Sequence, residues 1–234
     1  MNDIGAAWTT ALALIGGRDP QLMQIVALSL SVSLTAVVLS TLLGLPLGAV
    51  LAVARFRGRR SVLIVLNALM GMPPVVAGLL VYLLFSRAGP LGQFGLLFTP
   101  GAMIFAQTVL IAPITAALST QVLEDAWRQY EEQLRSLGAT RARAAFTLLW
   151  DARFSLITIV LAGFGRAAAE VGAVMIVGGN IDGVTRVMTT AIALETSKGD
   201  LPLALGLGMI LLGIVLAVNA LAQLVKDAAL RRYG

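Results

Sequence analysis

Long runs without a charged residue dominate this sequence of 234 residues. Four such runs cover residues 20–54, 61–86, 88–123 and 201–225, and a fifth apolar stretch, 154–177, is interrupted by two charges. Each run is longer than the ~20 residues that a helix needs to cross a hydrocarbon core of about 30 Å. A helix satisfies its own backbone hydrogen bonds in lipid, whereas an open strand edge leaves them unpaired. The runs therefore predict an all-α membrane protein with five transmembrane helices.

The second of these spans is expected to be interrupted. The five predicted spans are residues 24–52, 62–85, 102–120, 154–177 and 201–225. Gly71-Met72-Pro73-Pro74 lies near the middle of the second span, and adjacent prolines interrupt the hydrogen-bond ladder of a helix. Such a break is tolerated where the freed backbone faces protein or a water-filled path. Pro73 and Pro74 are therefore candidates for a pathway wall, and a simple packing kink is an equal alternative.

Basic residues are distributed unevenly among the loops. Twelve of the 17 follow the first, third and fifth spans, four precede the first span or follow the second and fourth, and Arg166 lies within a span. Because Lys and Arg are retained on the cytoplasmic side, we expect an extracytoplasmic N-terminus and a cytoplasmic C-terminus in a cell (inner) membrane. The positive balance of the chain then follows from topology, and no separate basic domain points to nucleic acid.

The segment before the first span lacks the basic start of a cleaved signal peptide. Ile4, Trp8, Ala11 and Ile15 recur on one helical face. This spacing predicts a short interfacial helix anchored by Trp8, with a poorly ordered tail as the alternative.

One long polar segment, Glu124 to Asp151, interrupts the apolar pattern. Its first half carries an apolar stripe with helical spacing, formed by Leu123, Trp127, Tyr130, Leu134 and Leu137. Gly138 suits the left-handed turn that ends many helices, and Thr140 can cap a second helix. The apolar side of that second helix is expected to comprise Ala142, Ala145, Phe146 and Leu149. The pattern predicts a protruding helical hairpin, with an apolar stripe and a mixed-charge rim, that suits insertion into a groove on a partner protein; the alternative is a helix lying on the lipid surface.

Arg166 and Glu170 are the ionisable residues deep in the predicted bilayer. Either charge alone costs at least ~2.5 to 3.5 kcal/mol at the centre of a membrane helix, and their spacing of four residues predicts that they pair. A functional interpretation makes Arg166 a transient counter-ion for an anion and Glu170 part of a gate. A structural pair that fixes helix or subunit packing is an equal alternative.

A second candidate site is the outer segment 178–190, which is rich in glycine and hydroxyl groups. Asn180, Thr189 and Thr190 offer neutral donors to a dehydrating oxyanion without holding it tightly, as a conducting path requires. Arg186 can draw anions toward the outer mouth. The same composition is also typical of an ordinary outer loop.

Several motifs in the chain resemble a known class of transport permeases. The spacing of Glu132, Gly138 and Leu148 resembles the cytoplasmic loop by which permeases of binding-protein-dependent ABC importers dock onto their ATPase. The chain departs from that pattern at Gln133-Leu134, where two alanines are usual, and at Trp150-Asp151, where leucine-proline is typical. Further motifs resemble the tungstate-specific branch of the molybdate/tungstate/sulfate permeases. They are Gly71 to Val76, Ser136 to Ala139, Gly165-Arg166 with Glu170 to Met175, and Gly178 to Ile181 with Thr185 to Ile192.

This resemblance implies the type I permease fold of ABC importers. Residues 1–234 would form one transmembrane permease domain with a cytoplasmic coupling hairpin at residues 124–151. The resemblance also implies a homodimer with its pathway at the subunit interface, two cytoplasmic ATPase subunits and an extracytoplasmic oxyanion-binding protein. The chain itself would hold no cofactor and no metal, since ATP and magnesium belong to the partner ATPase. The implied coupling residues are Glu132, Gly138, Ala139 and Thr140.

Two other classes of function compete with ATP-driven import of an oxyanion. An intramembrane enzyme acting on lipid or peptide needs a plausible acid/base pair, and a chain without histidine or cysteine offers only Arg166, Glu170 and hydroxyl groups there. A stand-alone secondary transporter is expected to contain an internal inverted repeat, which we do not find in the sequence. Tungstate and molybdate are near-identical tetrahedral dianions, so the preference for tungstate rests on the resemblance alone.

Overall fold

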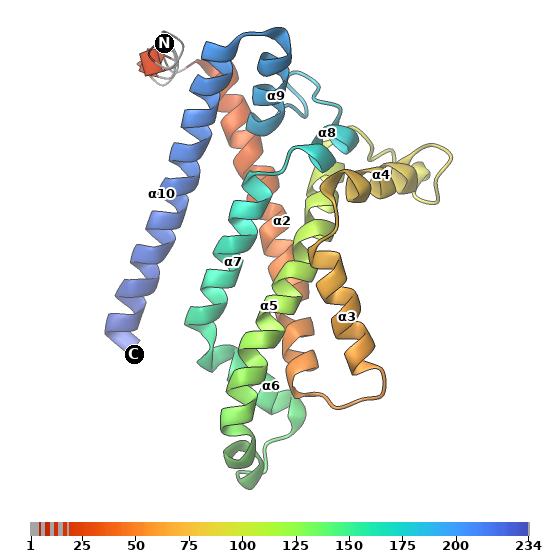
Figure 1. Cartoon of the computed structure of the whole chain (residues 1–234), viewed down its shortest axis with the longest axis vertical. Coiled ribbons are helices and arrows are strands. Elements are labelled where there is room, and N and C mark those ends of the chain that lie inside the picture. Colours follow the sequence, from red (N-terminus) through yellow and green to blue (C-terminus); the bar gives the residue numbers. More distant parts are fainter. Residues whose placement is uncertain (1–4, 6–7, 10–11, 14–15, 18, 234) are drawn as a thin grey trace.

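The computed structural model describes residues 1–234 except 1–4, 6–7, 10–11, 14–15, 18 and 234 (Figure 1). The elements are α2 (Pro20–Val53), α3 (Arg59–Met70), α4 (Pro74–Phe85), η1 (Gly92–Phe94), α5 (Pro100–Ser136), α6 (Arg141–Asp151), α7 (Arg153–Ala168), α8 (Gly172–Gly178), α9 (Met188–Lys198) and α10 (Leu201–Tyr233). Figure 1 shows α2, α5, α7 and α10 running along the long axis, with α4 projecting sideways. The predicted interfacial helix depends on Ile4, Ala11 and Ile15, which lie outside the described residues.

The all-α prediction is confirmed, since the described part of the chain contains helices and no strand. By length and composition, α2, α5 and most of α10 can each cross a membrane. Two bent pairs, α3 with α4 and α6 with α7, raise that number to five if each pair counts as one span. Five crossings therefore stay a prediction.

The centre of the molecule is a close pair of long helices, α2 and α5. A Cβ atom added to Gly44 would lie 2.0 Å from the Thr115 hydroxyl oxygen, and one on Gly48 would lie 2.0 Å from that of Ser119. Thr115 Oγ1 also donates a hydrogen bond to the Ser40 carbonyl at 3.0 Å. Small residues allow this approach, and the interhelical hydrogen bond adds to it. The two helices are therefore closely packed along this part of their length.

Two predicted spans are broken in the structure. The interruption predicted at Gly71-Met72-Pro73-Pro74 is confirmed, but it is a bend of 102° between α3 and α4, far larger than a kink. The prediction of one continuous helix over residues 154–177 is wrong, because α7 ends at Ala168 and α8 begins at Gly172. The third predicted span instead continues without interruption into the polar segment, as the single helix α5.

Candidate functional site

The two helix breaks lie side by side. A Cβ atom on Gly172, the first residue of α8, would lie 3.0 Å from a methyl carbon of Val75 in the first turn of α4. A Cβ atom on Gly78 would lie 2.7 Å from the Cα of Ala173. The glycines thus let α4 and α8 pack backbone to backbone. We call this region, residues 71–78 and 166–173, the break junction; in it the first turn of α4, which begins at Pro74, packs against the start of α8, which follows Glu170.

Glu170 is the most highly connected side chain of the break junction. Its side chain is 3% exposed, and one carboxylate oxygen accepts a hydrogen bond from Arg166 Nη1 at 2.5 Å. The other oxygen accepts from the backbone N–H of Ala173 at 3.0 Å, which satisfies an otherwise free donor at the start of α8. The predicted pairing of Arg166 with Glu170 is confirmed, although α7 ends between them. A carboxylate buried at this depth is tolerated because both oxygens are engaged.

Two side chains from other helices hold the backbone of the break between α7 and α8. Gln107 of α5 donates its amide N–H to the Ala167 carbonyl at 3.1 Å. Thr189 of α9 donates its hydroxyl to the Glu170 carbonyl at 2.8 Å. Both carbonyls lie at the break, where the donors of a continuous helix are missing, although the Ala167 carbonyl also accepts from the Glu170 N–H at 3.1 Å. The sequence analysis missed Gln107, although it is the only amide side chain in the span 102–120.

A small cavity adjoins these residues between α2, α5, α7 and α10. Polar groups of Ser33, Gln107, Glu170 and Thr189 contribute to its walls. It offers about 20 Å³ to the centre of a water-sized sphere, which is room for about one water molecule. The amide oxygen of Gln107 is buried without a hydrogen-bond partner among the described residues, so the cavity has a polar group available.

Hydroxyl groups of the outer segment 178–190 form hydrogen bonds with the backbone of the same segment. Thr185, which is fully buried, donates to the Gly178 carbonyl at 2.6 Å and accepts from the Ile181 N–H at 2.9 Å. Thr190 accepts from the N–H of Val187 at 3.1 Å and so caps α9. Of the predicted donors, Thr189 and Thr190 are thus engaged with backbone groups.

Asn180 and Arg186, the other two predicted residues of this segment, are placed differently. Asn180 adopts a left-handed backbone with φ of 50°, and its side-chain oxygen is buried without a partner in the described part of the chain. Arg186 pairs with Asp182 at 2.8 Å and contributes to a pocket of about 160 Å³ against Gln21 and Gln24 of α2. Arg186 is therefore the cationic group of this outer pocket.

The hairpin, residues 124–151, lies at the opposite end of the molecule from the outer segment (Figure 1). Gly138 has φ of 70°; its N–H donates to the Arg135 carbonyl, and the Ala139 N–H donates to the Leu134 carbonyl, each at 3.0 Å. This is the Schellman arrangement that ends a helix. Thr140 then accepts from the Arg143 N–H at 3.3 Å and caps α6. The predicted helix, turn and helix are confirmed.

Most of the apolar stripe of the hairpin faces inward. Leu123 and Trp127 are buried and Tyr130 and Leu134 half-buried in a cluster that includes Leu148 of α6, whereas Leu137 at the end of the stripe is exposed. Insertion of the hairpin into a partner protein stays a prediction, and the four covered residues are not available for it. The predicted apolar side of the second helix is confirmed at Ala145 and Leu149, which pack against this cluster, and is wrong at Ala142 and Phe146, which are exposed. Its buried residues are Ala144 and Leu148.

Other apolar side chains remain on the outside of the hairpin. Leu137 is 75% exposed, Phe146 70% and Trp150 66%. Glu132 is also exposed, on the same helical turn as Arg135. Large exposed apolar residues rimmed by polar groups are typical of a surface that binds another protein or a membrane.

Comparison with known proteins gives consistent results. Residues 44–233 match the family described as "Binding-protein-dependent transport system inner membrane component". The chain is 42% identical to a probable anion ABC transporter permease protein of Haloferax volcanii, over 91% of this chain and 94% of the relative. It is 40% identical to the tungstate uptake system permease protein TupB of Peptoclostridium acidaminophilum, over 97% and 100%. Its identity to the protein of the same name from Campylobacter jejuni is 37%, over 73% and 72%.

Proposed function

Because this chain belongs to the family of inner-membrane components of binding-protein-dependent transport systems, we propose that it carries tungstate through the membrane as the permease of an ATP-driven importer. The observation that supports this most strongly is the 40% identity, over nearly the whole of both chains, to a permease named for tungstate uptake. The relatives are named as transport permeases and not as enzymes. A chain of this family depends on an extracytoplasmic binding protein and on an ATPase for the energy of transport.

The proposed assembly has two copies of this chain, two cytoplasmic ATPase subunits and the oxyanion-binding protein. ATP and magnesium act in the ATPase, and this chain holds no cofactor of its own. The hairpin is the proposed docking element, with Glu132, Gly138, Ala139 and Thr140 as coupling residues. The exposed side chains of Leu137, Phe146 and Trp150 support this role, since they offer an apolar surface that the covered part of the stripe does not.

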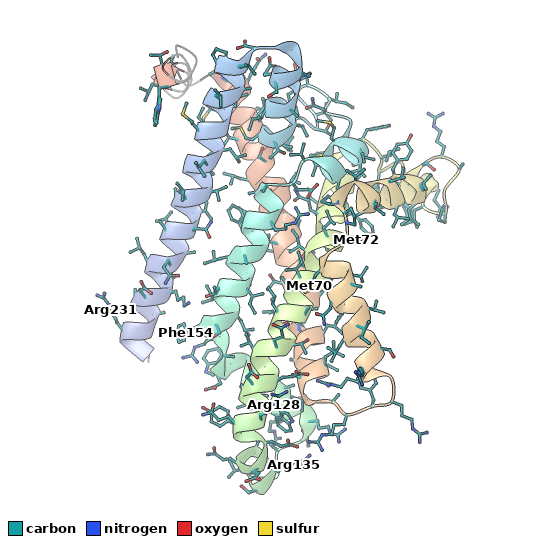
Figure 2. All side chains as sticks on the ribbon, viewed as in Figure 1. Met70, Met72, Arg128, Arg135, Phe154 and Arg231 are labelled. Carbon is teal, nitrogen blue, oxygen red and sulfur yellow. The ribbon has the colours of Figure 1, made fainter. Side chains whose placement is uncertain are left out.

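The proposed orientation places the N-terminus outside and the C-terminus in the cytoplasm. The loop between α2 and α3, the hairpin and the end of α10 all lie toward the same end of the long axis (Figure 1). Figure 2 shows Arg128, Arg135 and Arg231 toward that end. The positive-inside rule assigns this basic end to the cytoplasm. The hairpin would then face the ATPase, and α9 with the outer segment would face the binding protein.

The break junction is the proposed gate of the pathway. Pro73 and Pro74 interrupt the helix on one side of the proposed pathway. Glu170 connects α7, α8 and α9 through hydrogen bonds of its side chain and its carbonyl. Arg166 is 34% exposed whereas its partner is buried, so the guanidinium is the charge that an anion can approach. Arg186 and Asn180 belong to the proposed outer approach, where a cationic group raises the local concentration of dianions.

The first experiment measures uptake of trace tungstate by cells with and without this gene, in a strain that has no second tungstate system. Molybdate and sulfate are added as competitors in separate runs. We expect uptake to be lost on deletion, restored when the gene is returned, and resistant to excess molybdate. Uptake that persists after deletion would contradict the assignment of tungstate. Strong competition by molybdate would instead assign the permease to a broader range of oxyanions.

A further inference from the structure

α3 is held to the rest of the molecule by few buried side chains. Of its 12 residues only Leu66 is buried, and it packs against Leu51 of α2 and the small residues Ala116 and Ala117 of α5. Yet α3 leads directly into the bend before Pro74, one half of the break junction. The position of this half of the junction therefore depends on whatever fixes the other end of α3.

Arg59, the first residue of α3, supplies that contact. Its Nε atom donates to the Leu51 carbonyl at 2.7 Å, in the last turn of α2, where carbonyls lack intrahelical donors. Its terminal nitrogen pairs with the carboxylate of Glu124 in α5. The two side chains are 28% and 24% exposed, so the pair is shielded more than an ordinary surface ion pair. One guanidinium thus connects three helices.

The position of Arg59 in its own helix is electrostatically unfavourable. α3 begins with Arg59 and Arg60 and has no acidic residue in its first turn. A cation at a helix N-terminus opposes the helix dipole, so Arg59 is unfavourable for α3 itself. The interactions of Arg59 with the neighbouring helices are favourable, because its guanidinium faces the C-terminal end of α2 and a carboxylate of α5. Its contribution is therefore between helices and not within α3.

Close packing does not fill this part of the molecule. A pocket of about 220 Å³ lies between the end of α2 and α5, with Arg59, Glu124 and Glu131 among its walls. Arg55 of the connecting loop pairs with Glu131 at 3.1 Å, and Arg135 reaches the same carboxylate at 2.7 Å. The base of α3 and the loop before it are thus connected to α5 by two ion pairs, Arg59 with Glu124 and Arg55 with Glu131.

We propose that Arg59 is a positioning residue that couples the hairpin to the break junction. This inference rests on the proposed transport function. α5 runs without interruption from the hairpin, and it is fixed to α2 by the contacts at Gly44 and Gly48. When the ATPase displaces the hairpin, these two helices move together. The ion pair of Glu124 with Arg59 carries α3 along and changes the bend at Pro73.

The test compares charge-reversed variants of the complete importer in proteoliposomes loaded with ATP. Arg59→Glu and Glu124→Arg are measured separately and together, and both oxyanion uptake and ATP hydrolysis are recorded. For each single variant we expect the uptake per ATP hydrolysed to fall about tenfold while hydrolysis continues, a size typical of lost coupling between sites. The double variant restores the ion pair with reversed polarity, so its ratio should return toward that of the wild type.

Arg60→Glu is the matched control. Arg60 is the next residue of α3, is exposed, and makes no ion pair or hydrogen bond with any residue that the structure describes. The same change of charge there should leave the ratio close to wild type. If the single variants at Arg59 and Glu124 behave like this control, or if the double variant does not recover, the coupling role is wrong.

Two further arms separate the possible failures. If a charge-reversed single variant does not assemble, Arg59→Gln and Glu124→Gln are measured, and an unchanged ratio in both would overturn the proposal. The wild-type importer is run with tungstate, molybdate and sulfate in parallel. If the wild type takes up molybdate or sulfate but no tungstate, the proposed substrate is wrong. The Arg59 comparison is then made with the oxyanion that the wild type transports.

Discussion

The break junction and the hairpin are built in different ways. At the break junction, the local contacts of Glu170 are supplemented by residues distant in the chain, with Gln107 bonding to Ala167 and Thr189 bonding to Glu170. At the hairpin, Gly138 and Thr140 satisfy the helix ends within a few residues. The complete junction therefore requires the helices around it, whereas the turn of the hairpin is specified by its own residues.

The difference corresponds to the proposed roles of the two regions. A gate needs contacts between separate elements, because such contacts can be exchanged when the elements move. A docking element needs a fixed local shape, because a partner must meet the same surface in every step of the cycle. The predictions below test this contrast by removing one contact from each region.

The largest effect is expected for Glu170→Ala at the break junction. The change leaves Arg166 without its partner and removes the acceptor for the Ala173 N–H. We expect the free energy of unfolding to fall by about 3 kcal/mol, the lower end of the range for a broken buried pair because Arg166 is partly exposed. The measurement is thermal unfolding of the detergent-solubilised permease, followed by tryptophan fluorescence.

Asp125→Ala is the matched control in the hairpin. Asp125 and Arg128 also form an ion pair within one helical turn, but both side chains are largely exposed and the atoms are 4.0 Å apart. Exposed pairs of this kind contribute little to stability. We expect no measurable change in the unfolding temperature. Equal losses for Glu170→Ala and Asp125→Ala would contradict the contrast between the two regions.

A smaller loss of stability is expected for Gly138→Ala. A Cβ atom there meets no atom within 4 Å, so the cost comes from the left-handed backbone alone, about 1–2 kcal/mol. Gly208→Ala in α10 also meets open space but has an ordinary helical backbone, so it should stabilise by about 0.5–1 kcal/mol. Unfolding temperatures should therefore shift in opposite directions. Co-purification of the ATPase should fall only for Gly138→Ala, and an unchanged yield would argue against docking by this turn.

The same contrast explains which features could be predicted from the sequence. Gly138 and Thr140 act on neighbouring residues, so their residue types were sufficient to place the turn and the cap. The pairing of Arg166 with Glu170 was predicted from their spacing alone. The location of the interruption at Pro73 was predicted because proline removes a backbone donor wherever it stands.

Features that depend on distant residues were not predicted. The fourth span was expected as one helix because run length does not reveal continuity, and the break after Ala168 is held by Gln107 and Thr189 from other helices. α9 was missed because its sequence resembles a polar loop. Phe146 was assigned to the apolar side of its helix, but the position of α2 and α5 selects Ala144 and Leu148 instead. That the two breaks meet at Val75 and Gly172 is likewise a property of the fold.

Among the variants expected to lose stability, the smallest loss is expected for Thr140→Ala. Loss of the hydroxyl that accepts from the Arg143 N–H should cost about 1 kcal/mol, the typical value for a helix cap. Thr147→Ala in the same helix is the control, because that hydroxyl donates at 2.9 Å to the Arg143 carbonyl and alanine is the better helix former. Hydrogen exchange of the α6 backbone amides should therefore accelerate in the first variant and not in the second. Acceleration that spreads to α7 and α8 would show that the hairpin turn is not autonomous and would remove the distinction from the break junction.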